Sequence, residues 1–278
     1  MSWLEKGQEI DVILSSSGVR ASCFIGGLAA LEENGYKIKR IAGSSGGAII
    51  AAAYALGKST DELTQLAPHT PYQRFKDFRL NNLLSLSNPS VYKGQELDNY
   101  YKSIYGEATL SDFKIDCKIS VVTIIGRKRI LLDRESHPDL PVWKAVRMSS
   151  TIPFIFPYLE LEGVPITDGG LVTNMFDIFP ESPRPVIGLR PRQNFERKRD
   201  IQNVKASRLF VWNYLKIIIE YFLDVVDSVH MPAKEWLRTI VIPTDNVGGF
   251  NFDLTPDEIA TLIKSGYDAV STSELITE

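Results

Sequence analysis

The sequence predicts an α/β fold, a three-layer sandwich in which helices flank a central, mainly parallel sheet. Residues 10–14 form a short β-branched run that ends at a Ser-Ser-Ser-Gly loop, and residues 21–34 then have the pattern of a helix. Residues 38–42 form a second apolar run, which a Gly-Ser-Ser-Gly-Gly turn separates from the alanine-rich helical stretch 48–56. Two consecutive units of this kind predict right-handed crossovers, so both polar loops should lie at the carboxyl ends of parallel strands.

The rest of the chain supplies further strands and helices and one irregular stretch. Between residues 68 and 101, prolines and asparagines interrupt the aromatic and leucine positions, and we expect this segment to cover the site. Residues 164–167 form a short strand that runs into Asp168 and two glycines, which places Asp168 at a strand end as well. Strands are further predicted at 117–125, 128–133 and 239–243, and helices at 142–148, 205–227 and 255–270.

The composition is that of an ordinary globular protein and argues against one class of function. The chain has 278 residues, of which 44% are hydrophobic and 23% charged, so it can bury a large core, and we expect a single domain over residues 1–278. Its net charge of -3 provides no basic field for holding nucleic acid. No nucleic-acid partner is therefore expected.

Cysteine usage and hydropathy bear on where the protein acts. Cys23 and Cys117 lie in apolar surroundings, which is typical of packing in a reducing compartment rather than of disulfides. The N-terminus has no apolar run of signal-peptide length, and no window reaches the roughly 18 uninterrupted apolar residues of a spanning helix. We expect a cytoplasmic protein, with peripheral membrane attachment or export without a cleaved signal as alternatives.

The turn from Gly43 to Gly47 matches a nucleophile elbow. In a Gly-x-Ser-x-Gly pattern between a strand and a helix, Gly43 and Gly47 permit a strained turn that exposes the hydroxyl of Ser45. The helix that follows directs its partially positive N-terminus at Ser45, which favours an oxyanion there. A glycine- and serine-rich turn without chemistry is the alternative for this motif taken alone.

A serine nucleophile needs a base, and the sequence offers two arrangements. The chain contains only His69, His137 and His230, of which His230 would complete a triad in α/β-hydrolase order with Ser45 and Asp168. An α/β-hydrolase, however, normally has several strands before its elbow, whereas here one strand-helix unit precedes the elbow strand. Asp168 itself is the other candidate base, with a plain Asp-Gly turn as its structural alternative.

Four motifs, in this order, resemble the patatin-like phospholipases over roughly residues 10–270. They are the loop Ser15 to Arg20, the elbow around Ser45, the stretch Ser149 to Pro153 with Phe156 and Pro157, and Asp168-Gly169-Gly170 followed by Asn174. The resemblance implies a patatin-like fold and a Ser-Asp dyad, in which Asp168 takes the proton of Ser45. It also implies an oxyanion hole made of backbone N–H groups around Ser16, Ser17 and Gly18.

Three features leave alternatives open. The family usually has consecutive glycines where this chain has Ser16 and Ser17, so the hole is either narrowed, rebuilt from serine hydroxyls or impaired. Arg20 matches a basic position of the family, and it either holds a substrate phosphate or pairs with a carboxylate at the edge of the core. Residues 209–226 are aromatic-rich with few charges, and they form either an interfacial helix that meets lipid or a core helix.

Together these features predict a lipid acyl hydrolase that cleaves carboxylic ester bonds through Ser45 and Asp168. The expected partner is a membrane phospholipid or another acyl lipid, with peripheral contact to the membrane. No metal and no organic cofactor are implied. An acyltransferase that uses the same two residues and a catalytically weak lipid-binding protein are the alternatives.

Overall fold

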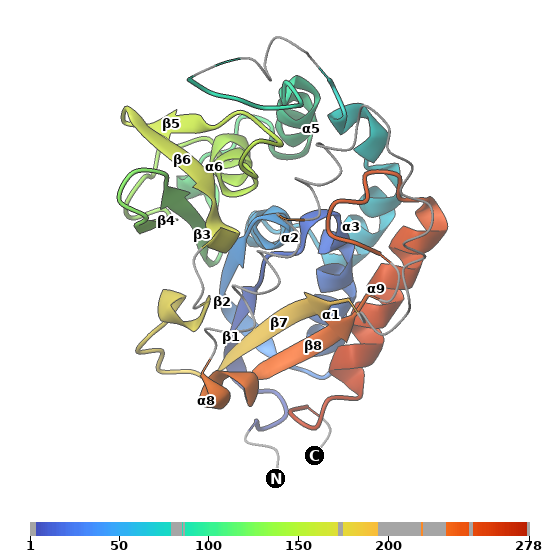
Figure 1. Ribbon diagram of the computed structural model, residues 1–278. Helices are drawn as coiled ribbons and strands as arrows, with labels where there is room; N and C mark the ends of the chain where they lie inside the picture. The colour runs from blue at the N-terminus through green and yellow to red at the C-terminus, as the bar shows by residue number, and fades with distance from the viewer. Residues whose placement is uncertain are drawn as a thin grey trace.

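A computed structural model describes residues 4–78, 85, 87–171, 175–193, 218, 232–244 and 247–276 of the protein. Within these residues a sheet of eight strands has the order β5-β6-β3-β2-β1-β7-β8, with β4 also paired to β3 (Figure 1). The strands are β1 Glu9–Leu14, β2 Lys37–Ser44, β3 Asp116–Thr123, β4 Arg129–Leu132, β5 Leu159–Leu161, β6 Val164–Asp168, β7 Val186–Arg192 and β8 Thr239–Pro243.

The sheet is mainly parallel. β1, β2, β3, β7 and β8 run in one direction, whereas β4 and β6 are antiparallel to β3, and β5 is antiparallel to β6. The two strand-loop-helix units expected at the N-terminus become β1 with α1 (Cys23–Glu33) and β2 with α2 (Gly46–Ala55). The predicted α/β fold with a central, mainly parallel sheet is confirmed.

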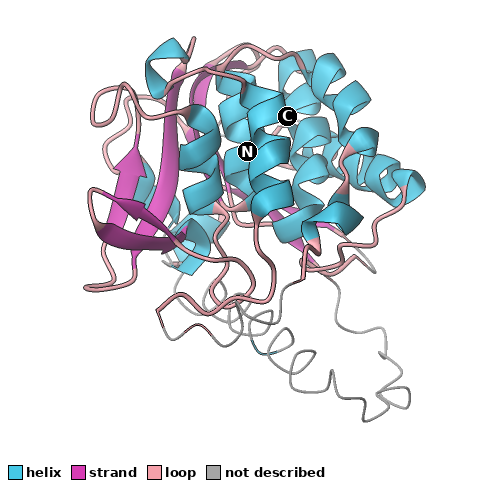
Figure 2. Ribbon diagram, turned by 90° about the horizontal axis from the view of Figure 1, so that it is seen from above, coloured by secondary structure: helices cyan, strands magenta, loops and turns pink. Residues whose placement is uncertain are grey.

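Helices gather over one face of the sheet, as Figure 2 shows from above. α1 packs tightly on α9 through Gly26 and Gly266, since a Cβ at either position would lie 1.8 Å from a carbonyl oxygen of the other helix. Side chains alternate along β1, so Val12 joins the large core cluster that includes α1 and α2, while Ile13 joins a smaller cluster with Phe176 on the opposite face. The helices are α1 Cys23–Glu33, α2 Gly46–Ala55, α3 Thr60–Leu66, α5 Gln95–Tyr105, α6 Val142–Ser149, α8 Ala233–Trp236 and α9 Pro256–Ser271.

Several elements differ from the sequence prediction, and α3, α8 and β5 were not expected at all. The irregular stretch expected to reach residue 101 ends earlier, because α5 begins at Gln95, directly after Gly94 with its left-handed φ of 76°. β7 was not expected, since Gly188 and Pro191 fall within it, yet it pairs with both β1 and β8. The predicted helix at 205–227 lies outside the described residues, residue 218 excepted.

The registers along β3 bring two strand ends together. Ser44, the last residue of β2, is paired with Ser120, while Asp168, the last residue of β6, is paired with Val121. β4 pairs with residues 119–122 of β3, some of which also pair with β2 and others with β6. β4 therefore lies along the edge of β3 opposite to both β2 and β6. Because a strand has only two edges, β2 and β6 meet end to end along one edge of β3, and the residues that follow them converge there.

Candidate active site

Ser45 occupies the sharp turn between β2 and α2. Its φ of 53° and ψ of −125° are sparsely populated by residues other than glycine, as a strained elbow requires. A Cβ on Gly43 would lie 2.5 Å from the carbonyl oxygen of Gly47, and a Cβ on Gly47 would lie 2.4 Å from that of Leu14. The two glycines singled out in the sequence thus allow the start of α2 to pack against the end of β1.

Ser45 and Asp168 contact each other directly. The Ser45 Oγ donates a hydrogen bond to Asp168 Oδ2 at 2.7 Å, and both side chains are buried. Asp168 Oδ1 accepts a hydrogen bond from the N–H of Gly170 at 2.7 Å, which holds the carboxylate in a fixed orientation. Since the hydroxyl and the carboxylate touch, no imidazole stands between them. His230, the third residue of the alternative triad, lies outside the described residues, as does Asn174.

Residues of the Ser149 to Pro153 stretch fix both sides of this contact. The Ser149 Oγ accepts a hydrogen bond from the N–H of Ser45 at 2.9 Å and donates one to the carbonyl of Ser120 at 2.7 Å. The carbonyl of Thr151 accepts a hydrogen bond from the N–H of Asp168 at 2.9 Å. The sequence motif marked this stretch without giving its residues a role, because contacts between residues that are far apart in the sequence, 104 positions for Ser45 and Ser149, leave no local pattern.

The loop Ser16 to Gly18 follows β1 and packs against the elbow. Gly18 has a φ of 58°, and a Cβ there would lie 2.0 Å from the carbonyl oxygen of Gly249, so this position requires glycine. The Ser16 Oγ donates a weak hydrogen bond to the Ser44 Oγ at 3.4 Å. Among the described residues, no oxygen accepts a hydrogen bond from the N–H of Ser17 or of Gly18.

Arg20 lies behind this loop. Its Nε donates a hydrogen bond to the carbonyl of Ser17 at 3.0 Å, and its Nη1 donates to Thr244 Oγ1 at 3.4 Å. The side chain is buried, so these contacts tie the loop to the residue that follows β8. The phosphate-binding role suggested for Arg20 stays a prediction.

A largely apolar cavity of about 280 Å³ opens beside Ser45. Its walls come from α2, α3, α5 and the short 3-10 helices at Ala67–His69 and Tyr72–Phe75, so the irregular stretch after residue 68 does lie against the site. The apolar wall residues include Ile25, Ile49, Leu63, Phe75, Leu97 and Phe156. An apolar chamber next to a serine hydroxyl suits a fatty acyl chain.

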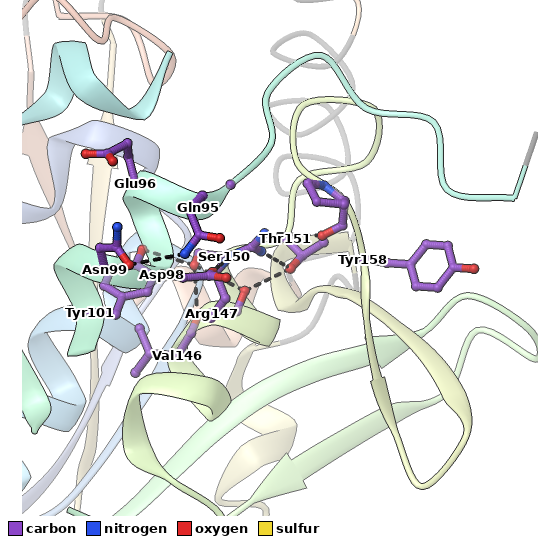
Figure 3. Close-up of polar contacts among 12 residues, drawn as sticks. Gln95, Glu96, Asp98, Asn99, Tyr101, Val146, Arg147, Ser150, Thr151 and Tyr158 are labelled. Carbon is purple, nitrogen blue, oxygen red and sulfur yellow. Dashed lines mark hydrogen bonds and ion pairs between the residues drawn. The ribbon is translucent and has the colours of Figure 1, made fainter. Parts of the chain in front are cut away.

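Arg147 braces the Thr151 segment from inside the protein. Its Nε donates to Asp98 Oδ1 at 2.7 Å, its Nη1 to Thr151 Oγ1 at 2.6 Å and its Nη2 to the carbonyl of Pro157 at 3.2 Å (Figure 3). The guanidinium is almost wholly buried. Because Arg147 lies on α6 and Asp98 on α5, this ion pair connects the two helices. The sequence carried no signal for this role, because Arg147 falls in an ordinary amphipathic helix.

The fold and the strand-serine-helix turn define an α/β protein of the nucleophile-elbow kind. A model of the patatin-like phospholipase family matches residues 12–179, which is more than half of the chain. The chain belongs to the patatin-like phospholipase family, and this membership supports the hydrolysis of acyl lipids as its class of activity.

Similar proteins come from bacteria and fungi. The protein YqhO of Bacillus subtilis (strain 168) is 30% identical over 284 residues, covering 92% of this chain and 95% of that protein. The lysophospholipase NTE1 of Pyricularia oryzae is 26% identical over 169 residues, but the match covers 61% of this chain and only 11% of the fungal protein. The crystal structure of VipD from Legionella pneumophila shares the fold, with a TM-score of 0.64, 16% identity, and coverage of 98% of this chain and 67% of that one.

The described residues include several helices that could in principle be tested by length and hydropathy as membrane-spanning segments. None of the helices within the described residues combines the length and the apolar character needed to cross a bilayer. The residues 209–226, for which an interfacial helix was one interpretation, lie outside the described residues apart from residue 218.

Proposed function

We propose that the protein hydrolyses carboxylic ester bonds of phospholipids or other acyl lipids through a Ser45-Asp168 dyad. The observation that supports this most directly is the 2.7 Å hydrogen bond from Ser45 Oγ to Asp168 Oδ2 at the wall of an apolar cavity. Family membership supports the substrate class, and the fungal relative is named a lysophospholipase. A membrane substrate implies peripheral contact with the bilayer that holds it.

Acylation begins with the transfer of the Ser45 hydroxyl proton to Asp168. The Ser45 oxygen attacks the ester carbonyl carbon, and the carbonyl oxygen becomes an oxyanion. In this proposal the charge is stabilised by the N-terminus of α2 and by the N–H groups of Ser17 and Gly18, which donate to no oxygen among the described residues. When the intermediate collapses, the bond to the alcohol oxygen breaks, and Asp168 returns its proton to the departing alcohol.

Deacylation repeats the same steps with water. Asp168 takes a proton from a water molecule, whose oxygen attacks the carbonyl carbon of the acyl-enzyme. Collapse of the second intermediate breaks the bond to Ser45, which regains its proton from Asp168. The products are a fatty acid and an alcohol or lysolipid, and the two residues end in their starting states.

The test compares fatty-acid release by the wild-type protein and by Ser45→Ala and Asp168→Ala, on a short-chain p-nitrophenyl ester and on mixed phospholipid vesicles. We expect either variant to lose at least about a thousandfold in kcat/KM. Ser111→Ala is the matched control, because Ser111 is exposed and lies on a separate 3-10 helix, Leu110–Asp112. Circular dichroism checks that each variant is folded.

Full activity in Ser45→Ala would refute the dyad. A folded wild-type protein that binds vesicles but releases no fatty acid from any lipid would instead favour a lipid-binding protein whose serine-substituted loop no longer supports catalysis. Product analysis with an added lysolipid acceptor separates hydrolysis from acyl transfer.

A further inference from the structure

The hairpin between β3 and β4 ends in an exposed apolar tip. Ile124 is 45% exposed and Ile125 is 76% exposed, and Val164 on the neighbouring strand is 39% exposed. Turns between strands are normally built from polar residues and glycine, and adjacent exposed isoleucines gain nothing for the fold there. The turn is closed without them, since Thr123 and Lys128 exchange hydrogen bonds of 2.9 and 3.0 Å.

The three apolar residues lie at one end of two neighbouring strands. Thr123 and Ile166 are the last paired residues of β3 and β6, and the N–H of Ile124 donates to the carbonyl of Pro165 at 3.0 Å. Ile125 follows Ile124 in the turn, and Val164 is the neighbour of Pro165 in the chain, so the three residues lie at the same end of the two strands. Isolated exposed hydrophobic residues need no explanation, but three of them gathered at one end of neighbouring strands mark an interaction surface.

This tip lies beyond the edge of the sheet that carries Ser45. Ser120 is level with the elbow, because its carbonyl accepts from the same Ser149 hydroxyl that holds the N–H of Ser45. β3 continues for three residues past Ser120, so the turn that carries the isoleucines begins roughly 10 Å farther in the direction of the site edge. Figure 1 shows β4, β5 and β6 at the upper left, whereas α8 and both termini lie at the lower end.

Cations flank the apolar tip. Arg127 and Lys128 follow the isoleucines and are exposed, while Arg129 is half-buried at the start of β4. The acidic groups on the adjoining hairpin are Glu160 and Glu162, which belong to β5 and to its turn with β6. Apolar side chains with cations directly behind them are the combination that binds the interface of an anionic bilayer.

We propose that Ile124, Ile125 and Val164 insert into the surface of a bilayer that contains anionic phospholipid, while Arg127 and Lys128 contact its headgroups. Docking by this tip turns the Ser45 edge of the sheet toward the membrane. The inference rests on the proposed function in one respect, namely that the bilayer holds the substrate. Binding itself requires no turnover, so the two proposals can fail separately.

The experiment measures sedimentation with vesicles of phosphatidylcholine, with or without a quarter of phosphatidylglycerol, in a Ser45→Ala background that leaves the lipid intact. We expect the pair Ile124→Ser and Ile125→Ser to weaken binding at least about tenfold, because burial of these side chains is lost. Leu237→Ser is the matched control: Leu237 is 72% exposed but precedes β8, at the opposite edge of the sheet. It should change binding by less than about twofold.

The cations are tested in the same background. Arg127→Asn and Lys128→Gln should each weaken binding to the anionic vesicles about fivefold and leave binding to pure phosphatidylcholine unchanged. Asparagine is chosen because Arg127 has a φ of 50°, which asparagine tolerates.

Several outcomes would overturn the inference. They are unchanged binding of the isoleucine variants, an equal loss in Leu237→Ser, and the same loss on both kinds of vesicle for the cation variants. If tip-dependent binding is found while the wild-type protein hydrolyses no lipid, the inference stands and the proposed function falls. If the wild-type protein hydrolyses vesicles and the changes at the tip do not affect this, the proposed function stands and the inference falls.

Discussion

The hydroxyl of Ser45 and the carboxylate of Asp168 are joined by a direct 2.7 Å hydrogen bond. Ser45 directly follows β2, and Asp168 is the last residue of β6. The last residues of these two strands pair with consecutive residues of β3, so the sheet itself sets the distance between Ser45 and Asp168. Side chains placed by a sheet are held more precisely than side chains on long loops. The contact is therefore a rigid feature of the fold, and it leaves no space for a third residue between the two.

The first prediction concerns His230. If Asp168 is the base, His230→Ala should retain kcat/KM within about twofold of wild type on a p-nitrophenyl ester. In a Ser-His-Asp triad, loss of the histidine costs several orders of magnitude, on the order of a millionfold in kcat. A loss of that size in a folded His230→Ala variant would replace the dyad with the triad. His137→Ala serves as the control, because the Nδ1 of His137 pairs with Ser136 Oγ in a turn after β4.

The second prediction concerns Gly46, the residue after the proposed nucleophile. A Cβ there would lie 2.2 Å from Ser17 Oγ and 2.4 Å from the carbonyl oxygen of Gly18. The loop from Ser16 to Gly18, which we propose holds the oxyanion, must move to accommodate it, and a displacement of about 1 Å costs about a hundredfold in rate. We expect Gly46→Ala to lower kcat by that amount, measured by steady-state kinetics at a temperature where circular dichroism shows native structure.

A companion variant decides how the serine-rich loop works. If the backbone N–H of Ser17 holds the oxyanion, Ser17→Ala should keep activity within about threefold, since the backbone is unchanged. A loss in Ser17→Ala as large as that in Gly46→Ala would assign the role to the Ser17 hydroxyl. Wild-type kinetics in Gly46→Ala would show that this loop is not part of the site.

The elements that the sequence predicted form through local interactions, whereas β7, which was not predicted, forms through pairing with strands far away in the chain. β1, β2 and α2 follow from local apolar runs and glycines, and α9 begins at the expected capping box of Thr255 and Glu258. β7 could not be predicted from its residues, because Gly188 and Pro191 disfavour a strand locally. Its place between β1 and β8 comes from long-range pairing, which overrides that local preference.

The same distinction holds for the site. The resemblance of the motifs to a known family implied that Ser45 and Asp168 act together. The distance between them depends on the register of β6 on β3, which no short sequence pattern encodes. The supporting contacts of Ser149 and Thr151 also span the sheet, so their roles emerge only in the folded chain. The close approach of Ser17 and Gly18 is the reason that we expect Gly46 to matter, whereas the sequence shows only that a glycine is present there.

The third prediction concerns Asp11, a buried carboxylate on β1. Burial alone would raise its pKa, but hydrogen bonds from Arg40, Ser182 and Arg184 outweigh burial and lower the pKa below its usual value. A lowered folded-state pKa stabilises the protein above the unfolded-state pKa of about 3.9, and this stabilisation is lost as the pH falls through the folded-state pKa. Asp11→Asn should therefore reduce the free energy of unfolding by about 3 kcal/mol at neutral pH.

Urea unfolding at neutral pH and at about pH 3 checks this prediction, because the difference between wild type and Asp11→Asn should narrow in acid. Glu9→Gln is the matched control on the same strand. Glu9 pairs with Lys39 at 3.0 Å, but both side chains are about half exposed, so its loss should cost less than about 1 kcal/mol. A difference that stays constant with pH would show that Asp11 acts by shape and not by charge.

The fourth prediction concerns Arg147, which links Asp98 on α5 to the segment that holds Asp168. Arg147→Lys keeps the charge but cannot reproduce a planar fork that reaches Asp98, Thr151 and Pro157 together. Because the side chains at positions 147 and 151 are buried, we expect a loss of about 3 kcal/mol in stability and a fall in Tm of roughly 5–10 °C. Lys264→Ala, which removes an exposed pair with Asp268 on α9, should change stability by less than about 0.5 kcal/mol.

Arg147→Lys should also lower kcat about tenfold with little change in KM, measured well below the Tm of the variant. The carbonyl of Thr151 accepts from the N–H of Asp168, and Thr151 itself does not line the apolar cavity, so a shift of Thr151 acts mainly on the position of Asp168, the proposed base, relative to Ser45. A loss of stability alone would leave kcat unchanged at a temperature where the variant is fully folded. An unchanged kcat there would mean that Arg147 supports only the fold, whereas a lower kcat with a wild-type KM would identify it as a residue that positions Asp168.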